Sequence, residues 1–285
     1  MAPSCANCFL IDNLVFYPSY RAPCGTHITS GKKIFVSNLL ETRLQEAKQI
    51  NGSFPRENTD FSVLWHVISK DGTIEGGNIT DEAINSAMQK LNEGFSNASI
   101  SFTLKNITRT VDLNLYTNAD EGNIYQDQMK QQLHQGGSDT LNIYSTGLLV
   151  LTDIGKLLGY STFPWDYQNK TWDDGVVIDK DTVPGGPYLT DRSDAGTLVH
   201  EVGHWVGLYH TFEGGCYGDG DYVDDTPPEY SSACGCPFGR DTCHDDTEPD
   251  PIDNFMDYTS DSCRVRFTPG QITRMHQQIL AYRIL

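Results

Sequence analysis

The chain has 285 residues, which is long enough for one large domain or for one domain with an appendage. Its formal net charge of −18 argues against nucleic acid and anionic membrane surfaces as partners. No stretch approaches the roughly 18 consecutive apolar residues of a membrane span. We therefore expect a soluble protein with no nucleic-acid partner and no membrane partner.

The composition favours secretion. Eight cysteines are typical of an oxidising compartment. Asn-x-Ser/Thr sequons, which accept glycans in a eukaryotic secretory pathway, occur at Asn51, Asn78, Asn97, Asn106 and Asn169. Residues 1–20 lack a basic first region and do not read as an intact signal peptide, so we expect that a leader is missing from this sequence. The predicted location is extracellular.

The first sixty residues differ in character from the rest. They contain the short motifs CANC and CGT and one helical stretch from about residue 37 to 50. The polar sequence NGSFPRENTD, residues 51–60, has the composition of a linker. We therefore divide the chain into an N-terminal segment, 1–60, that could be a propeptide, and a domain at 61–285.

From residue 61 the hydrophobic pattern alternates between strand and helix periods. The predicted elements are strands at 61–69, 99–105, 107–113 and 140–146 and helices at about 81–96 and 122–134. After about residue 210 the chain is rich in Gly, Asp, Pro and Cys until a last helix begins at Thr268, where TPGQ is a capping-box sequence. This predicts an α/β (α+β) fold: a twisted mixed sheet with helices, then an irregular half, divided near residue 210.

The stretch HEVGHWVGLYH, residues 200–210, concentrates metal-ligand chemistry. His200 and His204 are four residues apart and share one face of a helix. Glu201 lies beside them, close enough to reach a water held by the same ion. Two imidazoles at this spacing with a neighbouring glutamate suit a catalytic zinc site with a carboxylate general base.

The residues that follow make a chance match improbable. A lone His-Glu-x-x-His can arise on any amphipathic helix, but Gly207 can end that helix in the left-handed conformation. The chain can then turn back and present His210 as a third nitrogen ligand. Three protein ligands leave a fourth position for water, the arrangement of a catalytic rather than a structural site.

The pattern His-Glu-x-x-His-x-x-Gly-x-x-His is the signature of the metzincin zinc peptidases. NFMDY, residues 254–258, resembles the methionine turn of that clan, and DYVDDTPPE, GCPFGRDTC and DPIDNFMDY resemble the pappalysin family. The similarity runs from about residue 61 to the C-terminus and is strongest over 200–263. It implies a secreted zinc metalloendopeptidase, acting on proteins or peptides, with its active-site cleft between two subdomains.

The resemblance assigns roles to individual residues. Glu201 would transfer a proton from the attacking water to the leaving amine. Met256 would form the floor of the metal site without binding the ion. Tyr258 would hydrogen-bond the tetrahedral intermediate, although it could instead be a buried aromatic that packs on the methionine turn. Asp261 would line the S1′ pocket and select Arg or Lys there, although a solvated loop acid is an equal alternative.

The cysteines are assigned only in part. The family implies disulfides between Cys216 and Cys243 and between Cys236 and Cys263, which would staple the irregular half. Cys5, Cys8, Cys24 and Cys234 stay unassigned. The extra cysteine two residues before Cys236 leaves open which of the two pairs with Cys263.

Two further features suggest regulation and a second metal. YRAPCGT, around Cys24, resembles the prosegments of this family; its thiolate could occupy the fourth zinc position and keep the enzyme latent, or Cys24 could form a disulfide. The linker bond Pro55–Arg56 would be the excision point. An acidic, glycine-containing loop could bind Ca2+ or could simply be solvated. The candidate calcium residues are Glu213, Asp219, Asp221, Asp224 and Asp225.

Two other functions are compatible with the same residues. A catalytically inactive secreted metal-binding protein could keep the metal site on this fold, but it would have no need of Glu201. A zinc hydrolase that does not act on peptides is a weaker alternative.

Overall fold

The computed structural model describes residues 24–51, 58–148, 150–151, 155–185 and 194–284. The helices are α1 (Ser30–Asn51), α2 (Asp81–Phe95), α3 (Leu113–Asn118), α4 (Ile124–Leu133), α5 (Gly196–Trp205) and α6 (Pro269–Tyr282). The strands are β1 (Thr59–Ser69), β2 (Ile100–Val111), β3 (Thr140–Thr146), β4 (Val150–Leu151), β5 (Gly155–Lys156), β6 (Gly159–Ser161) and β7 (Val176–Asp179). Short 3-10 helices are η1 (Ser96–Ala98), η2 (Pro164–Asp166), η3 (Thr171–Asp173) and η4 (Lys180–Thr182).

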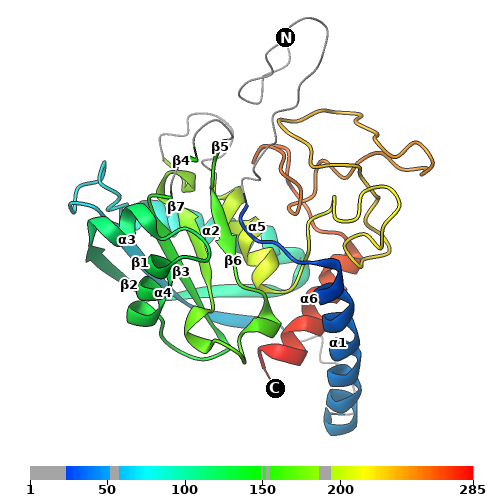
Figure 1. Ribbon diagram of the computed structural model, residues 1–285, viewed down its shortest axis with the longest axis horizontal. Helices are drawn as coiled ribbons and strands as arrows, with labels where there is room; N and C mark the ends of the chain where they lie inside the picture. The colour runs from blue at the N-terminus through cyan, green and yellow to red at the C-terminus, as the bar shows by residue number, and fades with distance from the viewer. Residues whose placement is uncertain (1–23, 52–57, 149, 152–154, 186–193, 285) are drawn as a thin grey trace, which may run out of the picture.

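A five-stranded mixed sheet in the order β2-β1-β3-β7-β6 forms the frame of the molecule (Figure 1). β2, β1, β3 and β7 are parallel, and β6 joins the edge antiparallel to β7. The predicted mixed sheet is therefore confirmed. Its edge strand β6 matters most for function, because it lies against helix α5.

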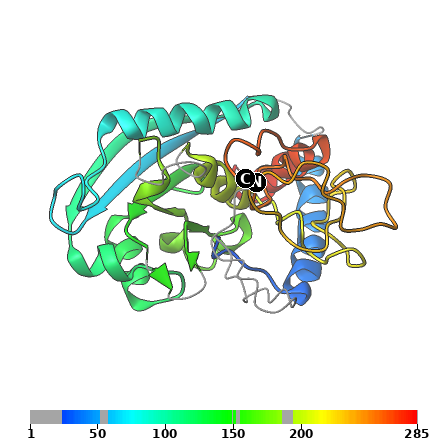
Figure 2. The ribbon, with the colours of Figure 1, turned by 90° about the horizontal axis from the view of Figure 1, so that it is seen from above.

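Helices cover both faces of the sheet (Figure 2). Alternate residues of each strand point to opposite faces, and Trp65 and Ile143 pack in one apolar cluster with α2 and α5. Ile68 and Tyr144 point the other way, into a second cluster with α3 and α4. Helix α5 therefore lies over the sheet, on the side that faces the C-terminal half.

Three boundaries differ from the sequence prediction. β2 is one strand rather than two, since a register shift places Lys105 as the extra residue and the pairing with β1 continues. Residue 113 begins helix α3, because the Asp112 side chain caps that helix. Only 52–57 of the predicted linker lie outside the described residues: Asn51 ends α1, and Thr59 begins β1.

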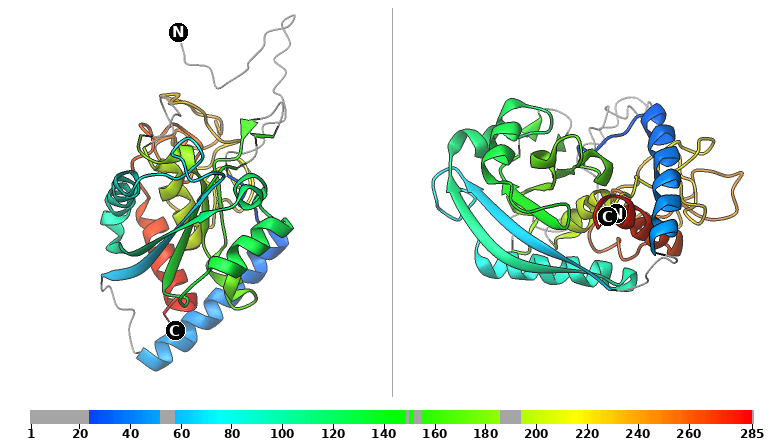
Figure 3. Two further views of the ribbon diagram at one scale, coloured as in Figure 1. Left: turned by 90° about the vertical axis from the view of Figure 1, so that its left-hand side faces the viewer. Right: turned by 90° about the horizontal axis from the view of Figure 1, so that it is seen from below.

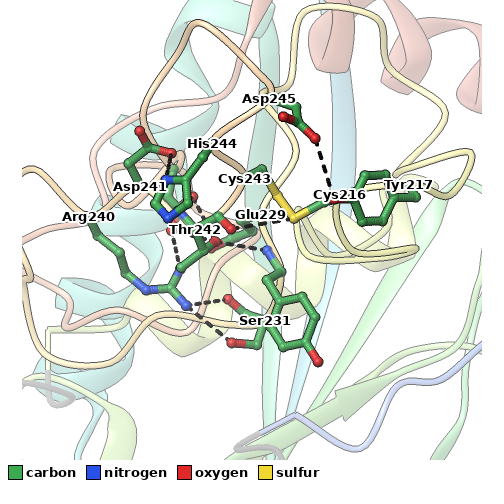
Figure 4. The surroundings of a disulfide bond; sticks show 12 residues. Cys216, Tyr217, Glu229, Ser231, Arg240, Asp241, Thr242, Cys243, His244 and Asp245 are labelled. Atoms are coloured by element: carbon green, nitrogen blue, oxygen red, sulfur yellow. Dashed lines mark hydrogen bonds and ion pairs between the residues drawn. A yellow bond between two sulfur atoms is a disulfide. The ribbon is translucent and has the colours of Figure 1, made fainter.

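The irregular half was predicted correctly. Between Val206 and Thr268, a stretch that the structure describes throughout, the chain forms no helix or strand and only one isolated bridge, which joins Asn254 to Arg266. The disulfides Cys216–Cys243 and Cys236–Cys263 tie this stretch together, and Figure 4 shows the first of them. Cys234 is also disulfide-bonded. The last helix begins as expected, with the capping box between Thr268 and Gln271.

Helix α1 lies along α6 at the edge of the molecule (Figure 3). Val36 and Leu40 are buried against Trp165 and Tyr282. The Arg43 guanidinium donates to the carbonyl of Ala281 at 2.9 Å. Helix α1 of the N-terminal segment is thus packed on the domain that follows it. Among the described residues, no helix has both the length and the apolar character to cross a membrane.

Candidate active site

Helix α5 carries the first two histidines and is buried along its whole length. Its apolar side chains, including Leu198 and Val202, fill the core between the sheet and the C-terminal half. The preceding residue, Ala195, has φ +62°, so the chain enters the helix through a sharp turn. Gly203 lies in close contact with Met256: a Cβ atom at this position would lie 2.5 Å from the Met256 sulfur. The methionine turn therefore packs directly beneath the histidine helix.

Gly207 ends the helix as its position predicts. Its φ is +97°, a conformation that glycine adopts at little cost. A Cβ atom there would also approach Gln278 of α6 to 2.4 Å. The turn brings His210 back to α5, where its Nε2 lies 3.1 Å from Nε2 of His204.

The three imidazoles are oriented to present free nitrogens to one point. His200 Nδ1 donates to the carbonyl of Phe255 at 2.7 Å, and His204 Nδ1 donates to that of Leu208 at 2.8 Å. Each Nε2 is thereby left unprotonated, and that of His200 is buried with no hydrogen-bond partner within the described ranges. Burial holds the pKa of His200 and His204 well below the ordinary value, so both rings are neutral. This donor set suits a metal ion, whose ligand histidines use their second nitrogen in the same way.

Glu201 is fully buried beside these histidines. Its Oε2 accepts hydrogen bonds from the Cys24 thiol and the Thr26 hydroxyl, both at 3.3 Å, and its buried Oε1 has no partner in the described part of the chain. Burial raises the pKa of this carboxyl to about 8. Gly159 makes room for it, since a Cβ atom on the edge strand would lie 2.8 Å from Glu201 Cγ.

Tyr258 reaches the same point from the methionine turn. Its hydroxyl lies 3.1 Å from His210 Nε2, and its ring packs on those of His200 and His210. Burial raises the pKa of the phenol well above its ordinary value, so the hydroxyl keeps its proton. A role in catalysis and a packing role are both compatible with this position.

Cys24 is a free, buried thiol that lies among the histidines. Its sulfur and one nitrogen of each of His200, His204 and His210 lie within 4.8 Å of one another. The backbone of the segment pairs with β6: Gly25 N–H donates to the Gly159 carbonyl at 2.9 Å. The alternative of a disulfide at Cys24 is therefore not what the structure contains.

The contacts of Asp261 differ from those expected of a free pocket acid. Its carboxylate pairs with Arg264 at 2.5 Å and accepts the backbone N–H groups of Asp194 and Gly196. Both side chains of the ion pair are nearly inaccessible to solvent. The charge that would select Arg or Lys is therefore already neutralised by the chain itself, and that selectivity stays a prediction.

The five calcium candidates do not converge. Glu213 contacts Lys33 and His210, Asp225 caps the start of α6 through Thr268 and Gly270, and Asp221 is buried against Val223 and Gln271. The remaining two, Asp219 and Asp224, are exposed. Among the described residues, the group of side chains placed closely enough to bind a metal ion is Cys24 with His200, His204 and His210. A calcium site here stays a prediction without a common set of ligands.

Sequence reasoning missed two residues of this site. Thr26, in the quoted CGT motif, bonds both Glu201 and the edge strand, since Ser161 N–H donates to its hydroxyl at 2.8 Å. Arg264 follows Cys263 and lies three residues after Asp261. The sequence did contain a signal for Arg264: a cationic residue three positions after a candidate pocket acid can pair with it.

Comparisons with known proteins agree with the geometry. The family described as "Pregnancy-associated plasma protein-A" matches residues 172–280, and the family "Metallo-peptidase family M12B Reprolysin-like" matches 81–211. An extracellular metalloprotease of Sordaria macrospora is 39% identical, over 91% of this chain and 88% of its own. One from Podospora anserina is 38% identical, over 93% and 92%.

Solved structures give the same result. A mutant of Tannerella forsythia promirolysin has a TM-score of 0.70 and 29% identity, and the match covers 91% of this chain and 94% of that one. Mature mirolysin in complex with a cleaved peptide has a TM-score of 0.65 and 30% identity, over 80% and 98%. Fold, histidine cluster and relatives together define a secreted zinc metalloendopeptidase of the metzincin type. The chain belongs to the pappalysin family of these enzymes.

Proposed function

We propose that His200, His204 and His210 hold the catalytic Zn2+ and that the enzyme hydrolyses internal bonds of peptides and proteins. The observation that carries this is the convergence of three buried imidazoles: backbone carbonyls fix the second nitrogens of His200 and His204, and the Glu213 carboxylate faces that of His210. When bound, the ion supplies a Lewis acid that polarises the scissile carbonyl and makes water more acidic. A mature relative bound to a cleaved peptide supports peptides as the substrate class.

Glu201 is the general base in this proposal. Its buried Oε1 has no hydrogen-bond partner among the described residues, so the ionised carboxylate can accept a proton from the attacking water there and deliver it to the leaving amine. Tyr258 donates a hydrogen bond toward the developing oxyanion, because its hydroxyl keeps its proton and lies beside His210. An inactive metal-binding protein would need neither group.

Replacement of the base tests this function. Glu201→Ala should lower kcat by about 10²–10⁴-fold, the usual contribution of a positioned general base. Its zinc content should stay stoichiometric, since the glutamate is not a ligand. The measurement is cleavage of a peptide library, with Cys24→Ala present in both proteins so that the site is open, together with metal analysis of the same samples. Undiminished turnover in the variant would refute the mechanism and favour the inactive metal-binding alternative.

We also propose that residues 1–60 are a propeptide that keeps the enzyme latent through Cys24. The thiol lies at the point where the three imidazoles converge, and Thr26 holds the same carboxylate that would act as base. The match to promirolysin covers 91% of this chain and that to mature mirolysin covers 80%. The predicted excision point, Pro55–Arg56, lies outside the described residues.

Removal of the thiol tests latency. The full-length Cys24→Ala variant should cleave peptides before any processing, whereas the wild-type precursor should not. Thr29→Ala is the matched control, because Thr29 lies in the same segment but its hydroxyl accepts the backbone N–H of Lys32 at the start of α1. A Cys24→Ala precursor as silent as the wild type would show that the thiol is not the latch.

A further inference from the structure

The guanidinium of Arg264 has an unsatisfied donor next to the catalytic groups. Its side chain is only 3% exposed, and one of its terminal nitrogens pairs with Asp261. Its Nε is buried and has no hydrogen-bond partner among the residues that the structure describes. A buried N–H without a partner is costly, so natural proteins rarely leave one without a reason.

Arg264 lines a cavity that borders the site directly. The other lining residues are Cys24, Leu158, Thr197, His200, Glu201 and Tyr258. With Cys24 in place the cavity measures about 10 Å3, which is space for about one water molecule. It can become a side-chain pocket only when the thiol withdraws, so the inference that follows rests on the proposed function.

The ion pair determines what such a pocket can accept. Asp261 already receives Arg264 and two backbone N–H groups, so an incoming Arg or Lys would have to displace a buried guanidinium to reach the carboxylate. The free Nε–H instead calls for a hydrogen-bond acceptor. A site whose buried donor is left unpaired by one substrate and satisfied by another discriminates strongly between them.

We propose that Arg264 sets the specificity of this pocket. It favours substrates whose side chain next to the scissile bond ends in a carboxylate or amide oxygen, and it excludes Arg and Lys. Arg264 thus takes the place at Asp261 that a basic substrate side chain would otherwise occupy. Asp261 becomes a positioning residue for the guanidinium.

Library profiling tests the proposal, with Cys24→Ala present in every arm to open the site of the full-length chain. With Arg264 intact, Glu, Gln, Asp and Asn should exceed Arg and Lys by about tenfold next to the cleaved bond. Arg264→Met should reverse the order by exposing Asp261. If that variant does not fold, Asp261→Asn combined with Arg264→Met removes both charges and should lose the acceptor preference. Dominance of Arg and Lys with Arg264 intact, or an unchanged profile in the variants, would overturn the proposal.

A second measurement does not depend on turnover. Arg264→Ala leaves a vacancy for a guanidinium against Asp261, so millimolar ethylguanidinium should raise its Tm, with no such rise in the wild type. Arg266→Ala is the matched control, since Arg266 pairs with Asp253 at the surface. No rise in Arg264→Ala would show that the cavity cannot hold a side-chain group and would overturn the proposal. If no peptide is cleaved in any arm but ethylguanidinium stabilises only Arg264→Ala, the pocket stands and the proposed peptidase function fails.

Discussion

The two halves of this protein are stabilised by different means. In the sheet half, strands and helices bury a continuous apolar core around Trp65, Phe95 and Trp205. In the fully described stretch from 211 to 250, Ala233 and Cys243 are the buried hydrophobic residues. Its other buried groups are polar or charged: Thr211, Asp221, Glu229 and Asp250. Stability there depends on disulfides and paired charges, which tolerate irregular backbone but require each partner.

The charge network of the irregular half centres on Arg240 (Figure 4). Its guanidinium pairs with the fully buried Glu229 at 2.8 Å and with Asp250 at 2.5 Å. Burial, and next the charge of Asp257, raise the pKa of Glu229 to about 8. Glu229 also accepts the hydroxyl of Thr211 at 2.7 Å, directly after His210. The network therefore supports the loop that presents the third metal ligand.

Of the changes considered, breaking this network should produce the largest difference in stability between the two halves. Arg240→Met leaves two buried carboxylates without their cation, a change that typically costs about 3–5 kcal/mol. The loss should be greatest at high pH, where Glu229, whose pKa burial raises to about 8, must ionise. The loss of stability should be confined to the irregular half. All four tryptophans, Trp65, Trp165, Trp172 and Trp205, precede residue 206 and report on the sheet half.

Two probes separate the halves. Limited proteolysis should cut Arg240→Met between 211 and 250 under conditions in which tryptophan emission is still native, and the affinity for zinc should fall. Arg266→Met, which removes an exposed ion pair from the same half, should cost no more than about 1 kcal/mol. If Arg240→Met loses native tryptophan emission under the same conditions in which it is first cut between 211 and 250, the two halves unfold as one unit.

The same difference explains what the sequence could predict. The apolar stripe identified α2, runs of strand-forming residues identified β1 and β3, and the capping-box sequence identified the start of α6, because each of these signals is local. Periodicity missed β6 and β7, which have three and four residues, are too short to show a period, and are fixed by pairing with distant strands. It also divided β2, since a bulge at Lys105 resembles a break in a single sequence.

At the site, the metal-ligand spacing was local and therefore readable, because His200, Glu201, His204, Gly207 and His210 lie within eleven residues. The partners of Asp261 and Glu201 could not be read from the sequence. Asp261 is paired with Arg264, close in sequence, and with Gly196, which is 65 residues away. Glu201 contacts Thr26 across 175 residues. A carboxylate's charge is visible in a sequence, but whether the fold neutralises it is decided by tertiary contacts.

The smallest expected effect concerns Asp221, which is 3% exposed and has no ion pair of its own among the described residues. Its carboxylate accepts the N–H of Val223 at 3.0 Å, and burial raises its pKa to about 7. A folded-state pKa above the ordinary value means that the folded protein holds the proton more tightly than the unfolded chain does. This residue's contribution to stability therefore falls as the pH rises from about 4 to about 7.

Asp221→Asn should remove that decline. Each pKa unit corresponds to about 1.4 kcal/mol, and asparagine loses some of the accepted hydrogen bonds, worth about 1 kcal/mol each. We expect a net gain of about 2 kcal/mol in the free energy of unfolding above pH 7 and little or no gain near pH 4, measured by urea titration at both pH values. Bound Ca2+ would reverse the outcome, because it would hold Asp221 ionised. The asparagine variant would then be less stable than the wild type at neutral pH, and a calcium chelator would abolish the difference.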